Sequence, residues 1–279
     1  MKITIYTATG CTRCKIVKNL MEEKNISYEE KDMKIEGKEE FHAFYKTNRS
    51  VIYRGSEGIE FPIITDGVAI RQGIAASIAY LCSGEKLDEF FSVGTLHKEW
   101  VDGIHISGGQ TERTDEFLEV LNYLKGKNMK LQIYTNGKNS YVLEHVLNNG
   151  LADVVIMEVV GPPELYNKIL GEEIDIYDIK KSFSLITQFP KFKIYTSIIP
   201  IKREDGQFSY LTPLELGETA KFINEGTGSN KIPYFIKKFK PKDSQNKDLK
   251  SFESLAANQL FSYRTKARAY QVFTEIEKE

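Results

Sequence analysis

The sequence has few of the features that several large classes of protein require. Only three of its 279 residues are cysteine, and two of these form one C-x-x-C pair, which is not the framework of a disulfide-rich secreted domain. No apolar run reaches the roughly 18 residues that a membrane span needs. The 38 basic and 39 acidic residues nearly cancel, so no overall field attracts nucleic acid or a membrane surface. We therefore expect a cytosolic protein with no membrane partner.

The chain is long enough for one large domain or two ordinary ones, each with its own core. Its first residues, MKITIYTATG, contain one Lys and a short apolar run followed by Thr and Gly. This composition predicts a first strand rather than a signal peptide.

The first 91 residues predict the element order β-α-β-α-β-β-α. Lys2 to Tyr6 alternates as a strand does, and Ile16, Leu20 and Met21 mark one face of the following helix. The pair EFPIITD and GVAIRQG predicts a hairpin that turns at Asp66-Gly67. The remaining expected elements are a strand at 27–33, a helix at 39–49 and a helix at 74–91.

The pattern changes near residues 91 to 97 and becomes a regular alternation of strands and helices. Apolar strands that alternate with helices imply a parallel sheet covered by helices. The expected strands are 101–107, 129–137, 152–160 and 191–200, and the expected helices are 114–128, 141–150, 176–189 and 212–226. A basic segment from Lys231 to Lys250 follows, and a last helical stretch is expected at about 249–276. The sequence thus predicts an α/β protein with domains at 1–91 and 97–242 and a helical extension at 243–279.

The C-x-x-C pair indicates thiol chemistry. Cys11 lies between a strand and a helix, where backbone N–H groups and the helix dipole favour a thiolate, and Cys14 is one turn further on. Arg13 and Lys15 add positive charge. These features favour disulfide exchange, with Cys11 as the attacking thiolate and Cys14 as the resolving thiol. Two alternatives stay open: a metal or cluster site completed by distant residues (His97, His105 or Cys82), and a pair of inert buried cysteines.

The segment IYTATGCTRCKIVKNLMEEKNISYEEKDM, with EFPIITDGVAIRQG after it, resembles the glutaredoxin family over about residues 1 to 90. The resemblance implies a thioredoxin fold in which Pro62 is a cis proline that faces the cysteines and shapes the partner groove. Thr12 replaces the proline usual between the cysteines. Ala75 and Ala76 stand where the family binds the glutathione amino group. The implied partner is therefore a protein thiol or disulfide rather than glutathione.

Three arginines near the expected hairpin, Arg49, Arg54 and Arg71, form a second group of candidates. They could bind an anionic partner close to Pro62. The alternative is ordinary solvated surface charge, which is the more frequent state of arginine.

A Gly-Gly pair, Gly108-Gly109, lies between an expected strand and a helix, where backbone can approach a ligand closely. The runs DGIHISGGQTE, LQIYTNG, LADVVIMEVVGPPELYNKILG and YTSIIP resemble, in this order, the radical SAM activating enzymes, especially those of anaerobic ribonucleotide reductase. The resemblance implies a truncated (β/α) half barrel with a binding site near Gly108, Gly109 and Gln110, and Asn136 matches the end of another barrel strand. A simple Asn-Gly turn is the alternative for Asn136.

This part of the chain departs from the family at the positions that bind its cofactors. No cysteine follows Cys82, although the family holds a [4Fe–4S] cluster on three cysteines of one loop. Gln110 stands where the family has a glutamate, and Tyr195 stands where it has an arginine. Residues 158–160, Glu-Val-Val, stand where it has Asp-x-Lys. We therefore expect a cluster-less domain that binds a partner or small molecule. In the alternative, Thr7, Cys11 and Cys14 reproduce the cluster spacing. The first domain then lends two thiolates, with Cys82 as the candidate for a third, to an Fe–S cluster shared with a SAM-binding second domain.

Together these patterns predict a glutaredoxin-like thiol–disulfide oxidoreductase with an accessory radical SAM-like domain. Its expected partner is a protein thiol or disulfide, in an anaerobic radical enzyme system. A non-catalytic metal or Fe–S binding module, or a SAM-binding protein, is the alternative. No cofactor is expected with certainty, and no dedicated metal site. The lysines between Lys231 and Lys250 predict solvated surface rather than a nucleic-acid site, because no stacking platform accompanies them.

Overall fold

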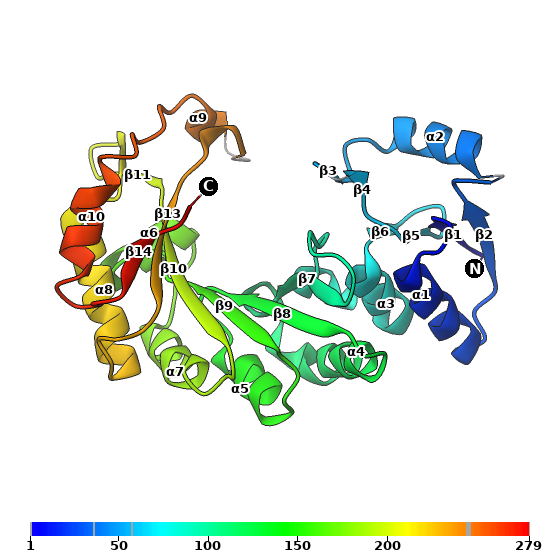
Figure 1. Cartoon of the computed structure of the whole chain (residues 1–279), viewed down its shortest axis with the longest axis horizontal. Helices are drawn as coiled ribbons and strands as arrows, with labels where there is room; N and C mark the ends of the chain where they lie inside the picture. Colours follow the sequence, from blue (N-terminus) through cyan, green and yellow to red (C-terminus); the bar gives the residue numbers. More distant parts are fainter. Residues whose placement is uncertain (1, 36, 57, 244–246, 279) are drawn as a thin grey trace. The chain divides into compact units, whose positions relative to one another are not determined.

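The computed structural model describes residues 2–35, 37–56, 58–243 and 247–278 (Figure 1). The chain divides into two compact units, and the boundary falls inside strand β8 (Lys130–Thr135). The first unit holds the residues up to Ile133 together with Asn148–Asp153. The second holds Tyr134–Leu147 and the residues from Val154 onward.

The first unit begins with a mixed four-stranded sheet in the order β2-β1-β5-β6. Strand β1 pairs in parallel with β2 and antiparallel with β5, and β5 pairs antiparallel with β6. The elements are β1 (Ile3–Thr7), α1 (Thr12–Glu23), β2 (Tyr28–Asp32), α2 (Lys38–Thr47), β5 (Ile63–Thr65), β6 (Ile70–Gln72) and α3 (Ile74–Ser83). The element order expected from the sequence is confirmed. A two-residue hairpin, β3 (Arg54–Gly55) with β4 (Gly58–Ile59), was not expected, because such short strands have no measurable alternation.

The amphipathic pattern of α1 explains how this sheet is covered. Val17, Leu20 and Met21 are at most 3% exposed, so the helix buries the face that the sequence marked. Ile5 on β1 and Ile63 on β5 are fully buried as well. Burial of such side chains contributes roughly 1.5–3 kcal/mol each, so this face stabilises the first unit.

The rest of the first unit follows α3. It comprises the 3-10 helix η1 (Gly84–Phe90), β7 (Trp100–His105), the short turns η2 (Ile106–Gly108) and η3 (Thr111–Arg113), α4 (Thr114–Gly126) and the start of β8. Phe90 stacks on Phe117 of α4 with ring centroids 4.3 Å apart, and both are fully buried.

The second unit continues the alternation of strands and helices. Its elements are α5 (Ser140–Asn148), β9 (Val154–Glu158), η4 (Pro163–Leu165), α6 (Tyr166–Leu170), α7 (Ile176–Ile186), β10 (Phe192–Ile198), β11 (Pro200–Lys202), β12 (Phe208–Tyr210), α8 (Pro213–Thr227), β13 (Tyr234–Lys238), η5 (Pro241–Asp243), α9 (Lys247–Lys250), α10 (Leu260–Ala267) and β14 (Thr274–Ile276). The strand order is β14-β13-β10-β9-β8-β7, and β10 pairs in parallel with both β9 and β13. The chain is therefore an α/β protein with a six-stranded sheet.

The expected C-terminal helix over residues 249–276 is wrong in part. The structure has two short helices, α9 and α10, and then β14, which pairs in parallel with β13 at the edge of the sheet. The amide of the fully buried Gln271 accepts from Ile232 N at 3.1 Å and donates to Ser229 O at 2.7 Å. These bonds tie the segment to residues forty positions earlier, a long-range partner that local periodicity does not reveal. Among the described residues, no helix combines the length and the apolar character needed to cross a bilayer.

Candidate redox site

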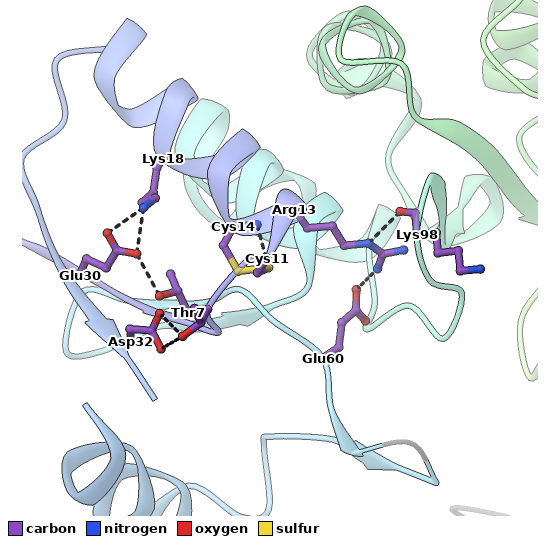
Figure 2. Close-up of a disulfide and its surroundings, with 10 residues drawn as sticks. Thr7, Cys11, Arg13, Cys14, Lys18, Glu30, Asp32, Glu60 and Lys98 are labelled. Atoms are coloured by element: carbon purple, nitrogen blue, oxygen red, sulfur yellow. Dashed lines mark hydrogen bonds and ion pairs between the residues drawn. A yellow bond between two sulfur atoms is a disulfide. The ribbon is translucent and has the colours of Figure 1, made fainter. Parts of the chain in front are cut away.

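Cys11 and Cys14 form a disulfide at the head of α1 (Figure 2), with their Cα atoms 5.3 Å apart. Cys11 is the N-cap of the helix, and its Sγ accepts from Cys14 N at 3.1 Å. Gly10 has a φ of +76°, which lets the chain turn sharply from β1 into the cap. Cys14 is 2% exposed whereas Cys11 is half-buried, so Cys11 is the sulfur that a partner can reach.

This position suits an anionic sulfur. The first backbone N–H groups of a helix have no partner within the helix, and the helix dipole is positive at this end. Because Cys14 N already points at Cys11 Sγ, the same donor is available to a Cys11 thiolate after reduction. The local structure therefore stabilises the reactive form of Cys11 rather than that of Cys14.

Arg13, inside the C-x-x-C, is buried and clamps the cysteine loop to the segment 94–99, called the connector here. Its guanidinium donates to Glu60 Oε1 at 2.7 Å and to Leu96 O at 2.6 Å. It also donates to Trp100 O. Figure 2 shows its bonds to Glu60 and, at 3.4 Å, to Lys98 O. Only 9% of Arg13 is exposed. The positive charge of Arg13, which the sequence predicted near the thiols, is instead used in contacts inside the protein.

Asp102 on β7 fixes the other side of the connector. Its Oδ1 accepts from Thr95 N at 2.8 Å and from Leu96 N at 2.9 Å, and its Oδ2 accepts from Thr95 Oγ1 at 2.9 Å. Gly94 makes this approach feasible, because a Cβ at that position would lie 2.6 Å from Asp102 Oδ1. The connector is thus held by a buried carboxylate on one side and a buried guanidinium on the other.

Glu60 is a buried carboxyl whose charge is only partly compensated. Burial raises the pKa of Glu60 to about 7, against the opposing effect of the Arg13 charge. The side chains of Arg13 and Glu60 are 10% and 9% exposed, so water screens this pair poorly. Glu60 Oε2 has no hydrogen-bond partner among the described residues.

The disulfide opens onto a cleft of about 730 Å³ within the first unit. Three segments line the cleft: the cysteine loop at 11–13, the hairpin region between Tyr53 and Phe61, and the connector at 94–98. The volume lies in the range of ligand sites in proteins, about 300–1,000 Å³. Because the connector forms one wall, residues after position 91 contribute to the surroundings of Cys11.

The Phe61–Pro62 bond is cis, as the resemblance to glutaredoxins implied. Phe61 lines the cleft with Cys11, while Pro62 itself is buried. Gln72, only 4% exposed, accepts from Tyr53 N and donates to Tyr53 O, both at 2.9 Å. The position of Tyr53 at the edge of the cleft is therefore fixed from the buried side.

The region where glutathione would be expected is filled by Glu60. The Glu60 carboxyl lies against Gly73, the N-cap of α3, so closely that a Cβ on Gly73 would be 3.0 Å from Oε1. Ala75 and Ala76, on the first turn of α3, are at most 8% exposed. The N-terminus of α3 is thus occupied by a carboxyl of the protein itself.

The three arginines singled out by the sequence differ in their surroundings. Arg71 donates to Asp88 Oδ1 at 2.8 Å and lies 4.8 Å from the ring centroid of Tyr80, so internal contacts use its charge. Arg49 and Arg54 are exposed and line a second depression of about 460 Å³ together with Tyr53. Tyr53 belongs to both depressions.

The remaining candidates for a cluster site do not converge on the disulfide. Cys82, near the end of α3, is half-buried, and burial raises the pKa of its thiol, with Lys24 and Glu119 as its charged neighbours. Lys24 is at the opposite end of α1 from Cys14, about 15 Å along the axis of the helix. Thr7 Oγ1 is bonded to Glu30 Oε1 at 3.0 Å. Three thiolates around one cluster are therefore not brought together by this fold, and the residues do not fit a [4Fe–4S] group.

Gly108 and Gly109 lie against the protein's own 3-10 helix η1. A Cβ on Gly109 would come within 2.1 Å of the Phe90 ring, and one on Gly108 within 2.3 Å of Glu89 O. Packing accounts for both glycines without a ligand. Gln110 follows them and is exposed in the first unit, whereas Asn136 belongs to the second. Their role in binding a cofactor stays a prediction.

Two of the positions that depart from the activating enzymes contact each other in the second unit. Tyr195 on β10 donates to Glu158 Oε2 on β9 at 3.1 Å. Burial, reinforced by the Glu158 charge, raises the pKa of the Tyr195 hydroxyl above its usual range. Lys237 Nζ lies 5.1 Å from the ring centroid of Tyr195.

Glu60 and Asp102 are the residues of the site that sequence reasoning missed. Asp102 had a signal, because it is an acid inside the apolar strand VDGIHI, where a buried carboxylate needs partners. Glu60 had only its closeness to Pro62, and nothing local pairs it with Arg13, 47 positions earlier.

Comparison with known proteins finds similarity in sequence to a curated relative and partial similarity to solved structures. No family model matches the chain. A protein of Methanocaldococcus jannaschii, provisionally named a glycyl-radical enzyme activating enzyme, is 25% identical over 177 residues, which is 61% of this chain and 68% of that protein. A match of 177 residues exceeds the first 91 residues, so it necessarily includes part of the later chain.

The structural matches have low sequence identity. A domain of pyruvate-formate lyase-activating enzyme from Bacteroides vulgatus has 9% identity and a TM-score of 0.41, over 64% of this chain and all of that one. Coproporphyrinogen III oxidase from Escherichia coli, described as a radical SAM enzyme, has 14% identity and a TM-score of 0.41, over 61% of this chain and 41% of that one. Scores of this size do not by themselves establish a common fold. In sequence, the chain is similar to a protein that is provisionally named an activating enzyme of glycyl-radical enzymes.

Proposed function

We propose that the chain is a thiol–disulfide oxidoreductase that acts through Cys11 and Cys14. The observation that carries the proposal is the Cys11–Cys14 disulfide at a helix N-terminus, with the exposed sulfur of Cys11 open to a cleft of about 730 Å³. One reachable sulfur with a buried neighbour is the arrangement that exchange needs.

The exchange balances without a further cofactor. In the reduced protein the Cys11 thiolate attacks one sulfur of a partner disulfide, and the other partner sulfur leaves as a thiolate. Cys14 then loses its proton and attacks Cys11 Sγ, which closes the disulfide and releases the second partner thiolate. Two electrons pass from the cysteine pair to the partner, and the released thiolates take up protons. An external dithiol restores the reduced pair by the same steps in reverse.

We also propose that residues 1–91 adopt the thioredoxin fold of glutaredoxins. The order β2-β1-β5-β6, the cis Phe61–Pro62 bond and the disulfide at the head of α1 support this assignment. The presence of Glu60 against Gly73 supports a partner other than glutathione. In this proposal a protein thiol or disulfide is the partner.

For residues 97–242 we propose a radical SAM-like half barrel without its own cluster loop, followed by the extension 243–279. The similarity to the M. jannaschii protein supports the relationship to activating enzymes. The separation of Cys82 from Cys14 speaks against a shared cluster. In this proposal the domain binds a component of a radical enzyme system, and the thiol pair serves that system. The rival, a SAM-dependent protein with a cluster on Cys11 and Cys14, is favoured only by the sequence similarity.

The test is a trapping experiment on the full chain with Cys82→Ser as background. In this background, we expect the further substitution Cys14→Ser to accumulate a mixed disulfide between Cys11 and a model disulfide peptide, which mass spectrometry detects. The background protein should reduce the peptide repeatedly without accumulating the mixed disulfide. The Cys11→Ser variant should neither reduce the peptide nor form the mixed disulfide. A trapped adduct on Cys14 instead of Cys11, or no adduct with an intact fold, would contradict the assignment.

A further inference from the structure

The surface beside the redox cleft has a composition typical of protein interfaces. Tyr53 and Val51 are 52% and 60% exposed, and Arg49 and Arg54 lie on the same depression. Tyrosine and arginine are the residues most enriched in the energetic centres of interfaces.

Among the described residues, no carboxylate pairs with the two arginines of this surface, in contrast to the other arginines of the region. Arg13 and Arg71 pair with Glu60 and Asp88. For Arg49 and Arg54, in the part of the chain that the structure describes, no carboxylate lies within ion-pair distance. Since two of four arginines are neutralised internally and the two at the depression are not, the surface is suited to an anionic ligand.

The depression and the cleft share Tyr53 as a lining residue, and this residue has a fixed support. Tyr53 lines both hollows, and the buried Gln72 holds its backbone through two hydrogen bonds of 2.9 Å. A ligand whose cysteine reaches Cys11 can therefore extend past Tyr53 toward Arg49 and Arg54. A small thiol in the cleft alone leaves this second hollow empty.

We propose that the partner of Cys11 is an extended, acidic segment of another protein, in which a cysteine or disulfide is followed closely by Asp or Glu. The segment places its sulfur in the cleft, packs on Tyr53, and pairs its carboxylates with Arg49 and Arg54. This inference rests on the proposed exchange at Cys11 and Cys14 and specifies its partner.

The experiment uses the reduced full chain with Cys82→Ser and three synthetic peptides, each closed by one internal disulfide. The peptides are identical except at two positions beside the second cysteine, which are Asp, Asn or Lys. We expect the kcat/KM for reduction to be highest for the Asp peptide. In the variant Arg49→Glu/Arg54→Glu the kcat/KM for the Asp peptide should fall at least about two- to thirtyfold, the effect of losing two exposed ion pairs, and the preference for Asp over Lys should reverse.

A matched control keeps the net charge change the same at a different place. Lys24→Glu/Lys34→Glu alters two exposed lysines that line neither hollow, and the peptide preference should persist. Salt at about 0.5 M should remove most of the preference for the Asp peptide in the protein that keeps both arginines, because salt screens exposed ion pairs. Circular dichroism verifies that each variant is folded.

The outcomes separate this inference from the proposed function. Equal rates for the three peptides, in the unchanged surface and in the arginine variant, would overturn the acidic partner and leave the exchange intact. Reduction of none of them would refute the exchange itself. Binding of an oligodeoxythymidylate that is lost in the arginine variant, with equal peptide rates, would identify the surface as a nucleic-acid site and overturn the inference.

Discussion

The buried pair of Arg13 and Glu60 predicts a specific dependence of stability on pH. The carboxyl of Glu60 has an ordinary pKa of 4.5 in an unfolded chain, and burial raises its pKa to about 7 in the folded protein. Between these values the folded state holds a proton that the unfolded state has released. The free energy of unfolding therefore falls as the pH rises through this range and is constant above it.

The size of the effect follows from the two pKa values. One pH unit of difference is worth about 1.4 kcal/mol, so the change from 4.5 to about 7 lowers the free energy of unfolding by about 3 kcal/mol. In Glu60→Gln the side chain keeps its size and the carbonyl that accepts from Arg13, but it does not titrate. We expect the wild type to lose about 3 kcal/mol relative to Glu60→Gln between pH 4.5 and pH 7.5.

Urea denaturation of the oxidised protein at several pH values measures this difference. Trp100 is the only tryptophan and its carbonyl accepts from Arg13, so its fluorescence reports on unfolding around the site. Glu85→Gln, at a carboxylate 72% exposed, is the control and should follow the wild type. Parallel curves for wild type and Glu60→Gln over the whole range would refute the reasoning, because they would show that Glu60 is no harder to ionise in the folded state.

Three further results are expected. Gly109→Ala should destabilise the chain by about 1–3 kcal/mol in urea denaturation, because the new Cβ overlaps the Phe90 ring; unchanged stability would show an open space there. Asp102→Asn should lower the free energy of unfolding by about 1–3 kcal/mol, because the carboxylate accepts from the connector with two oxygens and the amide has only one. The exposed Asp115→Asn should change this free energy little. Protein purified without oxygen should contain less than about 0.5 iron and sulfide per chain, because complete thiolate ligation is the rule for such clusters; contents near four would revive the cluster on Cys11 and Cys14.

The sequence predicted those parts of the fold that depend on local patterns. The helical face of Ile16, Leu20 and Met21 and the Asp66-Gly67 hairpin are visible within a few residues, and both are found. The C-x-x-C spacing likewise located the disulfide. These features can be predicted from residues that lie only a few positions apart in the sequence.

What the sequence did not predict depends on distant contacts. Arg13 was expected to add charge near the thiols, but three carbonyls 83 to 87 positions later and Glu60 take up its donors. The Phe90 ring lies against Gly109 from 19 positions earlier, while the expected role of Gly109 in binding a ligand stays a prediction. Strand β14 was hidden because its stability comes from pairing with β13. In each case the deciding partner is chosen by the tertiary structure.

The central claim, that Cys11 and Cys14 are a reversible redox pair, is tested most directly by a redox titration of the full chain with Cys82→Ser. The protein is equilibrated in buffers of reduced and oxidised dithiothreitol, quenched with an alkylating reagent and weighed by mass spectrometry. We predict a single two-electron transition in which two labels per chain appear together on Cys11 and Cys14 and disappear on reoxidation. Labels that do not depend on the potential, or that appear only after a metal chelator is added, would contradict the account.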